Sequence, residues 1–245
     1  MRITRMLLLS AAAIVMTGGA YAADLIVSEP EPMMMAPASA HDWSGAYVGI
    51  SGGYAMGTVD WTGEYFAGGV GGGEFGDDFD VSGWLLGAQA GANVQFDSFV
   101  LGVEGDISWT NISGEGDGIG PGPDFTVPSA SIDWIGTLRG RAGVAFDQVL
   151  VYATAGFAYG AGEVGLTNLD GALDDRTADL TAGGWVAGIG AEVALDDNLS
   201  IKGEYTYTSL TMDEIQFGDV LPADYLAVNG DVGIHTFKVG LNYAF

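Results

Sequence analysis

The stretch GWLLGAQAGANVQFDSFVLGVEGDISWT, residues 83–110, contains two segments in which apolar and polar residues alternate. In the first, Trp84 and every second residue after it are apolar, and most of the residues between them are glycine, glutamine or asparagine. In the second, apolar residues alternate with a set that includes Glu104 and Asp106. A period of two residues is typical of a β-strand with two different faces. Because Asp97-Ser98 lies between the segments, we predict two antiparallel strands joined by a tight hairpin.

The same alternation continues in six further segments between residue 43 and the C-terminus, so we predict eight strands in all. The connections between them alternate in length. The short connections lie at Asp97-Ser98, Asp147-Gln148 and Asp196-Asp197, and the long ones span roughly 57–81, 110–130, 163–179 and 210–232. Short turns on one side and long loops on the other are the pattern of an eight-stranded antiparallel, up-and-down transmembrane β-barrel.

Aromatic residues on the apolar faces distinguish a membrane barrel from a soluble sandwich. One set lies at the long-loop ends of the strands: Trp84, Trp109, Trp134, Tyr159, Trp185 and Tyr207. A second set lies at the short-turn ends: Phe96, Phe99, Phe146 and Tyr243. At about 3.3 Å per residue and a strand tilt near 40–45°, the two sets are separated by roughly 23–30 Å, the height of a hydrocarbon core. We therefore interpret them as the two aromatic girdles of an all-β membrane protein.

The first residues carry an export signal. Arg2 and Arg5 precede an apolar run from Met6 to Met16, and Ala20-Tyr21-Ala22 matches a cleavage site. We assign residues 1–22 to a signal peptide, 23–42 to a flexible periplasmic leader and 43–245 to the barrel. Export through the Sec pathway would place the chain in the cell outer membrane, with both ends of the barrel in the periplasm.

The composition of the chain excludes nucleic-acid binding and transmembrane helices. The chain has 32 acidic residues against seven Lys and Arg, which excludes nucleic-acid binding because the phosphate backbone needs a basic surface. No stretch after the signal reaches about 20 consecutive apolar residues, and a membrane protein without such helices must be a closed barrel.

Charged residues on the polar faces form the main candidate site. They are Glu104, Asp106, Arg139, Arg141, Glu192, Lys202, Glu204 and Lys238. If the short turns at Asp97-Ser98 and Asp147-Gln148 lie at the same height in the barrel, Asp106 is expected near Arg139 and Glu104 near Arg141. One interpretation is a charged constriction that selects ions. The other, which we favour, is a neutralised and packed interior, because an eight-stranded barrel is just wide enough for side chains to fill it.

The long connections are rich in acidic residues, among them Glu74, Asp77, Asp78 and Asp80. They could bind divalent cations, including those that bridge lipopolysaccharide, but no spacing matches a known calcium loop. A solvated, repulsive surface is the interpretation we favour. The one conceivable catalytic set is His235 with Asp231 and Asp213, which is little support for catalysis. We therefore expect no enzymatic activity, no resident metal and no cofactor.

Several stretches resemble the RopB-type, porin-family outer-membrane proteins of alphaproteobacteria. They include WSGAYVGISGGY (Trp43 to Tyr54), VEGDI (Val103 to Ile107) and the terminal VGLNYAF (Val239 to Phe245). The resemblance implies an eight-stranded, OmpA-like barrel without an enzymatic role. The final Phe245 resembles the signal that the barrel-assembly machinery reads.

Two functions follow from these patterns. The first is a structural surface protein that is anchored in outer-membrane lipid and lipopolysaccharide, has a plugged barrel, presents acidic loops, and supports envelope integrity or surface interactions. The alternative is a narrow, porin-like channel for small solutes or ions.

Overall fold

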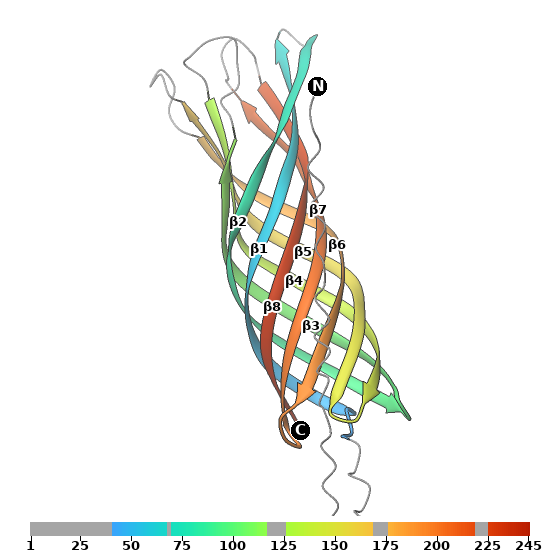
Figure 1. Ribbon diagram of the computed structural model, residues 1–245. Helices are drawn as coiled ribbons and strands as arrows, with labels where there is room; N and C mark the ends of the chain where they lie inside the picture. Colours follow the sequence, from blue (N-terminus) through green and yellow to red (C-terminus); the bar gives the residue numbers. More distant parts are fainter. Residues whose placement is uncertain (1–40, 68–69, 117–125, 169–175, 219–224) are drawn as a thin grey trace, which may run out of the picture. The chain divides into compact units, whose positions relative to one another are not determined.

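A closed, eight-stranded antiparallel barrel occupies the described part of the chain, as Figure 1 shows. The computed structural model describes residues 41–67, 70–116, 126–168, 176–218 and 225–245, and only the backbone at 63–67, 70–77, 126–128, 166–168, 176–180, 213–218 and 225–229. The strands are β1 (Gly45–Ala67), β2 (Val70–Phe96), β3 (Phe99–Glu115), β4 (Thr126–Phe146), β5 (Val149–Asn168), β6 (Arg176–Ala194), β7 (Leu199–Gly218) and β8 (Tyr225–Ala244). The predicted fold class is confirmed. The signal peptide and all but the last two residues of the leader lie outside the described residues.

Each strand pairs with its neighbours in sequence, and β8 closes the barrel against β1. Following paired residues around the barrel from Gly45 returns to β1 at Ala55, ten residues farther along. This stagger means that the strands are tilted, by about 35–45° in barrels of this kind. The tilt later decides which charged residues meet inside. Within the described residues, no helix is long and apolar enough to cross a membrane.

Three short connections lie at one end of the barrel, which we call the turn end. Asp97 and Asp147 begin two of them with φ angles of 53° and 57°. Aspartate tolerates this left-handed conformation because its short side chain can bond to the local backbone. In the third, Asp196 Oδ1 accepts hydrogen bonds from the N–H groups of Asn198 and Leu199. These backbone bonds hold the pKa of Asp196 below its usual value.

Asp97→Val is expected to lower the free energy of unfolding by about 1–2 kcal/mol, because a β-branched residue is strained at positive φ. Asp97→Gly should cause no loss, since glycine adopts this conformation freely. Urea unfolding of the refolded protein in lipid vesicles, followed by tryptophan fluorescence, measures both. Equal stability of the two variants would contradict the turn assignment.

At the opposite end, the loop end, the strands continue far beyond the segments predicted from alternation. The first long connection was predicted at 57–81, but β1 and β2 stay paired until Ala67 meets Val70. The predicted loops at 110–130, 163–179 and 210–232 are also largely strand. These loop boundaries were wrong because the apolar residues in these stretches occupy the inward-facing positions of the alternation and not the outward-facing ones.

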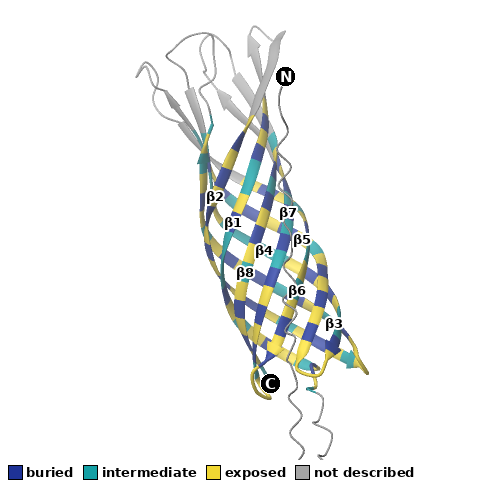
Figure 2. Cartoon of the chain, viewed as in Figure 1, coloured by how far each residue is buried: buried dark blue, intermediate teal, exposed yellow. Residues whose placement is uncertain are grey.

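The outward-facing positions change from apolar to polar at the loop-end aromatic girdle, a ring of residues around the barrel that includes Trp84 and its neighbour Tyr54. On the turn-end side of this ring, large apolar side chains such as Ile50 and Leu86 are exposed on the outside, and polar ones such as Gln89 are buried. On the loop-end side, which we call the stem, Asp60 and Thr62 are exposed outside. Buried stem residues on the inside form one apolar cluster with others at ring level: Ala55, Val59, Trp61, Phe79, Val81, Leu85, Ile112, Ala130, Ile132, Ala158, Ala182, Val186, Leu210, Met212, Val232 and Ile234. Figure 2 shows the alternation of buried and exposed residues along the strands.

This reversal has a simple physical cause. Apolar side chains face outward where the surroundings are lipid and inward where the surroundings are water. The lipid-facing band therefore ends at the loop-end aromatic girdle, and the stem is a water-facing barrel section with its own hydrophobic core. From Tyr54 at the ring to Trp61 the chain advances seven residues, which raises the stem by roughly 17 Å at the expected tilt.

Candidate functional site

Eight charged residues meet inside the barrel, on the turn-end side of the apolar stem core. They come from five strands: Glu104 and Asp106 from β3, Arg139 and Arg141 from β4, Glu192 from β6, Lys202 and Glu204 from β7, and Lys238 from β8. Seven of these side chains are at most 4% exposed, and that of Lys238 is 10% exposed. We call this group the ion-pair layer. Buried charges are tolerated only when they are paired and hydrogen-bonded, so the partners decide what the layer does.

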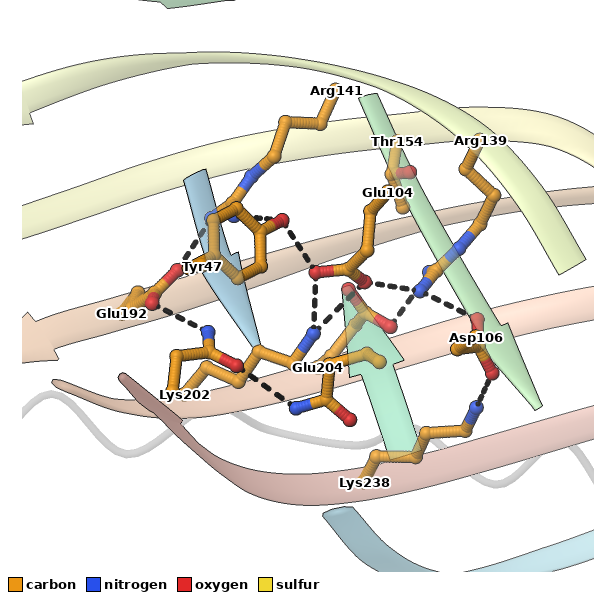
Figure 3. A network of polar contacts seen from close by, with 12 residues as sticks. Tyr47, Glu104, Asp106, Arg139, Arg141, Thr154, Glu192, Lys202, Glu204 and Lys238 are labelled. Carbon is orange, nitrogen blue, oxygen red and sulfur yellow. Dashed lines mark hydrogen bonds and ion pairs between the residues drawn. The ribbon is translucent and has the colours of Figure 1, made fainter. Parts of the chain in front are cut away.

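Arg139 is the centre of the layer and binds three carboxylates, as Figure 3 shows. Its Nη2 lies 2.6 Å from Glu104 Oε1 and 3.1 Å from Asp106 Oδ2, and its Nη1 lies 2.7 Å from Glu204 Oε1. A planar guanidinium can hold several carboxylates at once because its N–H groups point in fixed, different directions. Arg139 therefore connects β3 directly to β7 across the lumen.

Arg141 forms the second centre, between two tyrosine rings. Its Nη2 lies 2.6 Å from Glu192 Oε2, and its guanidinium carbon lies 3.8 Å from the ring centroid of Tyr152. Its Nη1 donates to Tyr47 Oη at 3.1 Å, and Tyr47 Oη donates to Glu104 Oε2 at 2.7 Å. The tyrosine hydroxyl therefore joins the two arginine centres into one network.

Two lysines complete the charge balance. Lys202 Nζ donates to both carboxylate oxygens of Glu104, at 2.9 and 2.8 Å. Lys238 Nζ donates to Asp106 Oδ1 at 2.8 Å. With the two arginines, four positive groups face four carboxylates, so the formal charge of the layer is zero.

Two inward-facing glycines make room for the tyrosine rings. Tyr47 pairs with Gly91 on β2, and Tyr152 pairs with Gly190 on β6. A Cβ atom would lie 2.5 Å from the Tyr47 ring at Gly91 and 2.4 Å from the Tyr152 ring at Gly190. No real side chain packs this closely, so glycine is what allows both rings to lie across the lumen.

The predicted pairing of Glu104 with Arg141 was wrong. In the register, Glu104 lies opposite Arg139, and Arg141 lies opposite Gly102. The prediction placed the short turns level with each other, whereas the tilt of the strands shifts the register of β3 and β4 by two residues. The predicted neighbours Asp106 and Arg139 do lie together, and Arg141 instead binds Glu192.

Sequence reasoning missed several uncharged members of the site. Tyr47 and Tyr152 are buried, and both are out of step with the outward apolar residues on either side of them. Ser200 Oγ and Asn242 Nδ2 donate to Glu192 Oε1 at 2.6 and 2.7 Å. The period of two contains the signal that would have found the tyrosines, because their position places them on the lumen face.

The predicted girdle residues lie on the outer surface of the barrel. The structure places Trp84, Trp109, Tyr159, Trp185, Phe96, Phe99, Phe146 and Tyr243 outside and exposed, and leaves Trp134 and Tyr207 half-buried. The loop-end set also includes two residues that the prediction left out. Tyr54 lies opposite Trp84 with its ring centroid at 5.1 Å, and His235 lies opposite Tyr207 at 4.9 Å. Each of the eight strands thus contributes one aromatic side chain to this ring.

Phe245 ends the chain at the turn end, next to the start of β1. Its N–H donates to the carbonyl oxygen of Ala46 at 3.0 Å. Its side chain is 75% exposed, and its ring centroid lies 5.5 Å from that of Tyr243. The side chain does little for the packing of the folded barrel. A role during assembly therefore remains a prediction.

Deleting Phe245 is expected to reduce insertion into the outer membrane several-fold, because the assembly machinery would lose the terminal aromatic. Phe245→Tyr is the matched control and should insert normally. Heat-modifiable mobility of the membrane fraction on gels measures the inserted amount. Normal insertion of the deletion variant would rule out the assembly-signal interpretation.

The side chains of most acidic residues in the predicted loops lie outside the described residues. Of the four named in the first connection, Asp78 and Asp80 are exposed on the stem, whereas the side chains of Glu74 and Asp77 lie outside the described residues, as does that of Asp213. His235 shares a hydrogen bond of 2.8 Å with Tyr205 Oη. Among the side chains that the structure describes, no three His, Cys, Asp or Glu are arranged to hold a metal ion.

Comparisons with known proteins agree with this architecture. Residues 32–245 match the family described as outer membrane protein beta-barrel domain. The 31 kDa outer-membrane immunogenic protein of Brucella melitensis biotype 1 is 34% identical over 251 residues, covering 97% of this chain and 98% of that protein. The 22 kDa outer membrane protein of Rhizobium leguminosarum bv. viciae is 30% identical, covering 69% of this chain and 65% of that protein.

Among solved structures, the outer membrane protein OprG from Pseudomonas aeruginosa matches with a TM-score of 0.55 and 17% identity, covering 84% of this chain and 98% of that chain. At this identity the likeness concerns the fold alone. The relatives confirm the resemblance to alphaproteobacterial outer-membrane proteins and the predicted location in the outer membrane.

Proposed function

Because the chain belongs to the outer membrane protein beta-barrel domain family, we propose that it is a structural surface protein whose lumen is sealed by its own side chains. The observation that carries this proposal is the ion-pair layer, in which three buried cations and the nearly buried Lys238 neutralise four buried carboxylates. A ring of charged side chains that selects ions carries an excess of one sign. In this layer the charges balance, and seven of the eight side chains are at most 4% exposed.

Apolar layers on both sides of the ion pairs support the same proposal. Toward the loop end lies the stem core, in which Ile112, Leu210 and Ile234 are at most 1% exposed. Toward the turn end lies a smaller cluster of Trp43, Val100, Ala145, Leu150, Tyr152 and Ala194. An ion that crossed the barrel would have to leave water at two apolar layers, at a cost of many kcal/mol.

Planar-bilayer recording of the refolded mature chain tests the proposal. We expect a quiet bilayer at protein concentrations at which a general porin, used as the positive control, gives steady steps. Circular dichroism and heat-modifiable mobility on the same sample would verify that the barrel is folded. Reproducible single-channel steps from the folded protein would overturn the proposal and favour the narrow channel.

In this role the outer surface makes the contacts. The apolar band would meet outer-membrane lipid, and the loop-end aromatic girdle would lie at the level of the headgroups. The stem would stand among lipopolysaccharide, with divalent cations bridging its exposed carboxylates to lipid phosphates. If so, EDTA should reduce the lipopolysaccharide that co-purifies with the protein, and unchanged co-purification would exclude the bridging. The exposed outer face of the stem would be the part presented to the surroundings, and the proposal involves no enzymatic step.

A further inference from the structure

A short segment outside the sheet, residues 41–44, leads into the barrel at its turn end. Strand β1 begins after it, at Gly45, which pairs with Asn93 on β2. Gly45 has a φ angle of 130°, which glycine adopts freely and other residues rarely do. A Cβ atom at this position would also lie 3.3 Å from the carbonyl oxygen of Phe245. Glycine therefore allows the chain to change direction just before the strand begins.

The side chain of Trp43 in this segment closes the turn end of the lumen. Trp43 is 7% exposed and belongs to the smaller apolar cluster. The other members of this cluster come from β3, β4, β5 and β6: Val100, Ala145, Leu150, Tyr152 and Ala194. Within the described residues, β2, β7 and β8 add no apolar member and carry buried polar residues instead, among them Asn93, Ser200 and Asn242. The indole ring thus supplies, from outside the sheet, an apolar contact that half of the barrel wall lacks.

One residue of the barrel wall holds the segment in place. The N–H of Trp43 donates to Gln95 Oε1 at 2.8 Å, and the N–H of Gln95 donates to Ser44 Oγ at 3.1 Å. Gln95 Nε2 donates to the carbonyl oxygen of Asp97 in the adjacent turn, at 2.7 Å. Among the described residues, the hydrogen bonds between the segment and the barrel run through Gln95. A strand in a sheet has a whole ladder of such bonds, so this attachment is much weaker.

One group of Trp43 opposes the closed arrangement. Its indole N–H is buried, and no described residue accepts a hydrogen bond from it. A buried donor without a partner costs free energy, which is recovered when the donor meets water. Burial of the ring therefore favours the closed position, while the unpaired N–H favours release.

From these observations we propose that residues 41–44 form a latch, in which Gly45 is the hinge, Gln95 is the catch and the Trp43 ring closes the lumen. Opening withdraws the ring and admits water to the turn-end layer while the strands stay paired. The latch rests on the proposed function, because it gives the sealed lumen one movable part.

A thiol at position 145 tests the latch, because Ala145 is 8% exposed in the same apolar cluster. With Ala145→Cys in the full chain in lipid nanodiscs, we expect slow modification by a small, water-soluble thiol reagent. Adding Trp43→Ala should speed the reaction about tenfold or more, since the ring no longer covers the site. Trp84→Ala, the matched control, removes an exposed tryptophan from the outer surface and should leave the rate unchanged. Equal rates with and without the Trp43 ring would overturn the latch.

Two further variants separate a movable latch from a fixed plug. Gln95→Leu keeps the ring but removes its catch, and Gly45→Ala strains the hinge in the closed position. Both should speed modification at position 145 several-fold, while heat-modifiable mobility shows that the barrel is folded. Unchanged rates in both variants would mean that Trp43 is fixed in place, and would overturn the latch.

A thiol on the loop-end side of Glu204 distinguishes failure of the latch from failure of the proposed function. Thr206→Cys places it there, at a position that is 4% exposed. If only the latch is wrong, this thiol stays protected and the rates at position 145 do not respond to the variants. If the lumen is not sealed, the thiol at position 206 reacts with the Trp43 ring in place, and the latch falls with the proposed function.

Discussion

Replacing Arg139 with leucine is expected to lower the free energy of unfolding by about 3–5 kcal/mol, the usual cost of removing one partner from a buried ion pair. Glu104, Asp106 and Glu204 would lose their shared partner in a part of the lumen where they are nearly inaccessible to water. Lys202 and Lys238 would still compensate Glu104 and Asp106, but no lysine contact to Glu204 replaces the lost one within the described network. Urea unfolding in lipid vesicles measures the change.

Two comparisons make this result specific. Adding Glu204→Gln to Arg139→Leu should recover part of the loss, because it removes the carboxylate with the least remaining compensation. Asp133→Asn removes an exposed charge from the same strand and should change stability by less than about 0.5 kcal/mol. A loss below about 1 kcal/mol for Arg139→Leu would mean that the ion-pair layer is not closed to water.

The second large effect concerns the stem. Ile112 is 1% exposed in the middle of the stem core, so Ile112→Ala is expected to cost about 2–5 kcal/mol through lost burial and the cavity that remains. The effect should be seen in the same unfolding experiment. This result is not expected of a loop, which is what the long connections were predicted to be.

Ser113→Ala is the matched control for this prediction. Ser113 is the next residue of β3, is exposed on the outside of the stem, and should tolerate the change within about 0.5 kcal/mol. If both substitutions were neutral, the stem would lack a packed core.

Much of the fold could be predicted from alternation because lipid imposes a consistent polarity on each face of a strand. The same rule failed at the stem. Val59, Trp61, Phe79 and Val81 were assigned to a loop because they continue the period of two with the opposite polarity. Alternation identifies a membrane strand by its outward-facing apolar residues, and water reverses that preference.

A bulge accounts for another error. Strict alternation would place Ile132 on the outward face with Trp134, but the register shifts between these residues, and Ile132 is buried in the lumen. A bulge inserts one residue and exchanges the faces beyond it. Asp133 at this position carries no pattern that identifies a bulge in a single sequence.

The candidate site could be predicted in membership but not in pairing. The eight charged residues were identified because each is out of step with the apolar face of its strand. Their partners depend on the stagger between strands, which is a property of the closed barrel and not of any one segment. The contact between Arg139 and Glu204 joins strands that are distant in the sequence and could not be read from alternation.

Cysteine accessibility tests most directly whether the barrel is sealed, because the chain contains no cysteine of its own. Thr206→Cys would place a thiol in the lumen, at a position that is 4% exposed, and Thr181→Cys would place one on the exposed outer surface of the stem. With a small, water-soluble thiol reagent added to the protein in lipid vesicles, we predict that Cys at 181 reacts fully and that Cys at 206 stays unmodified until the protein is unfolded. Comparable reaction rates at the two positions would mean that water fills the lumen, and would contradict the account.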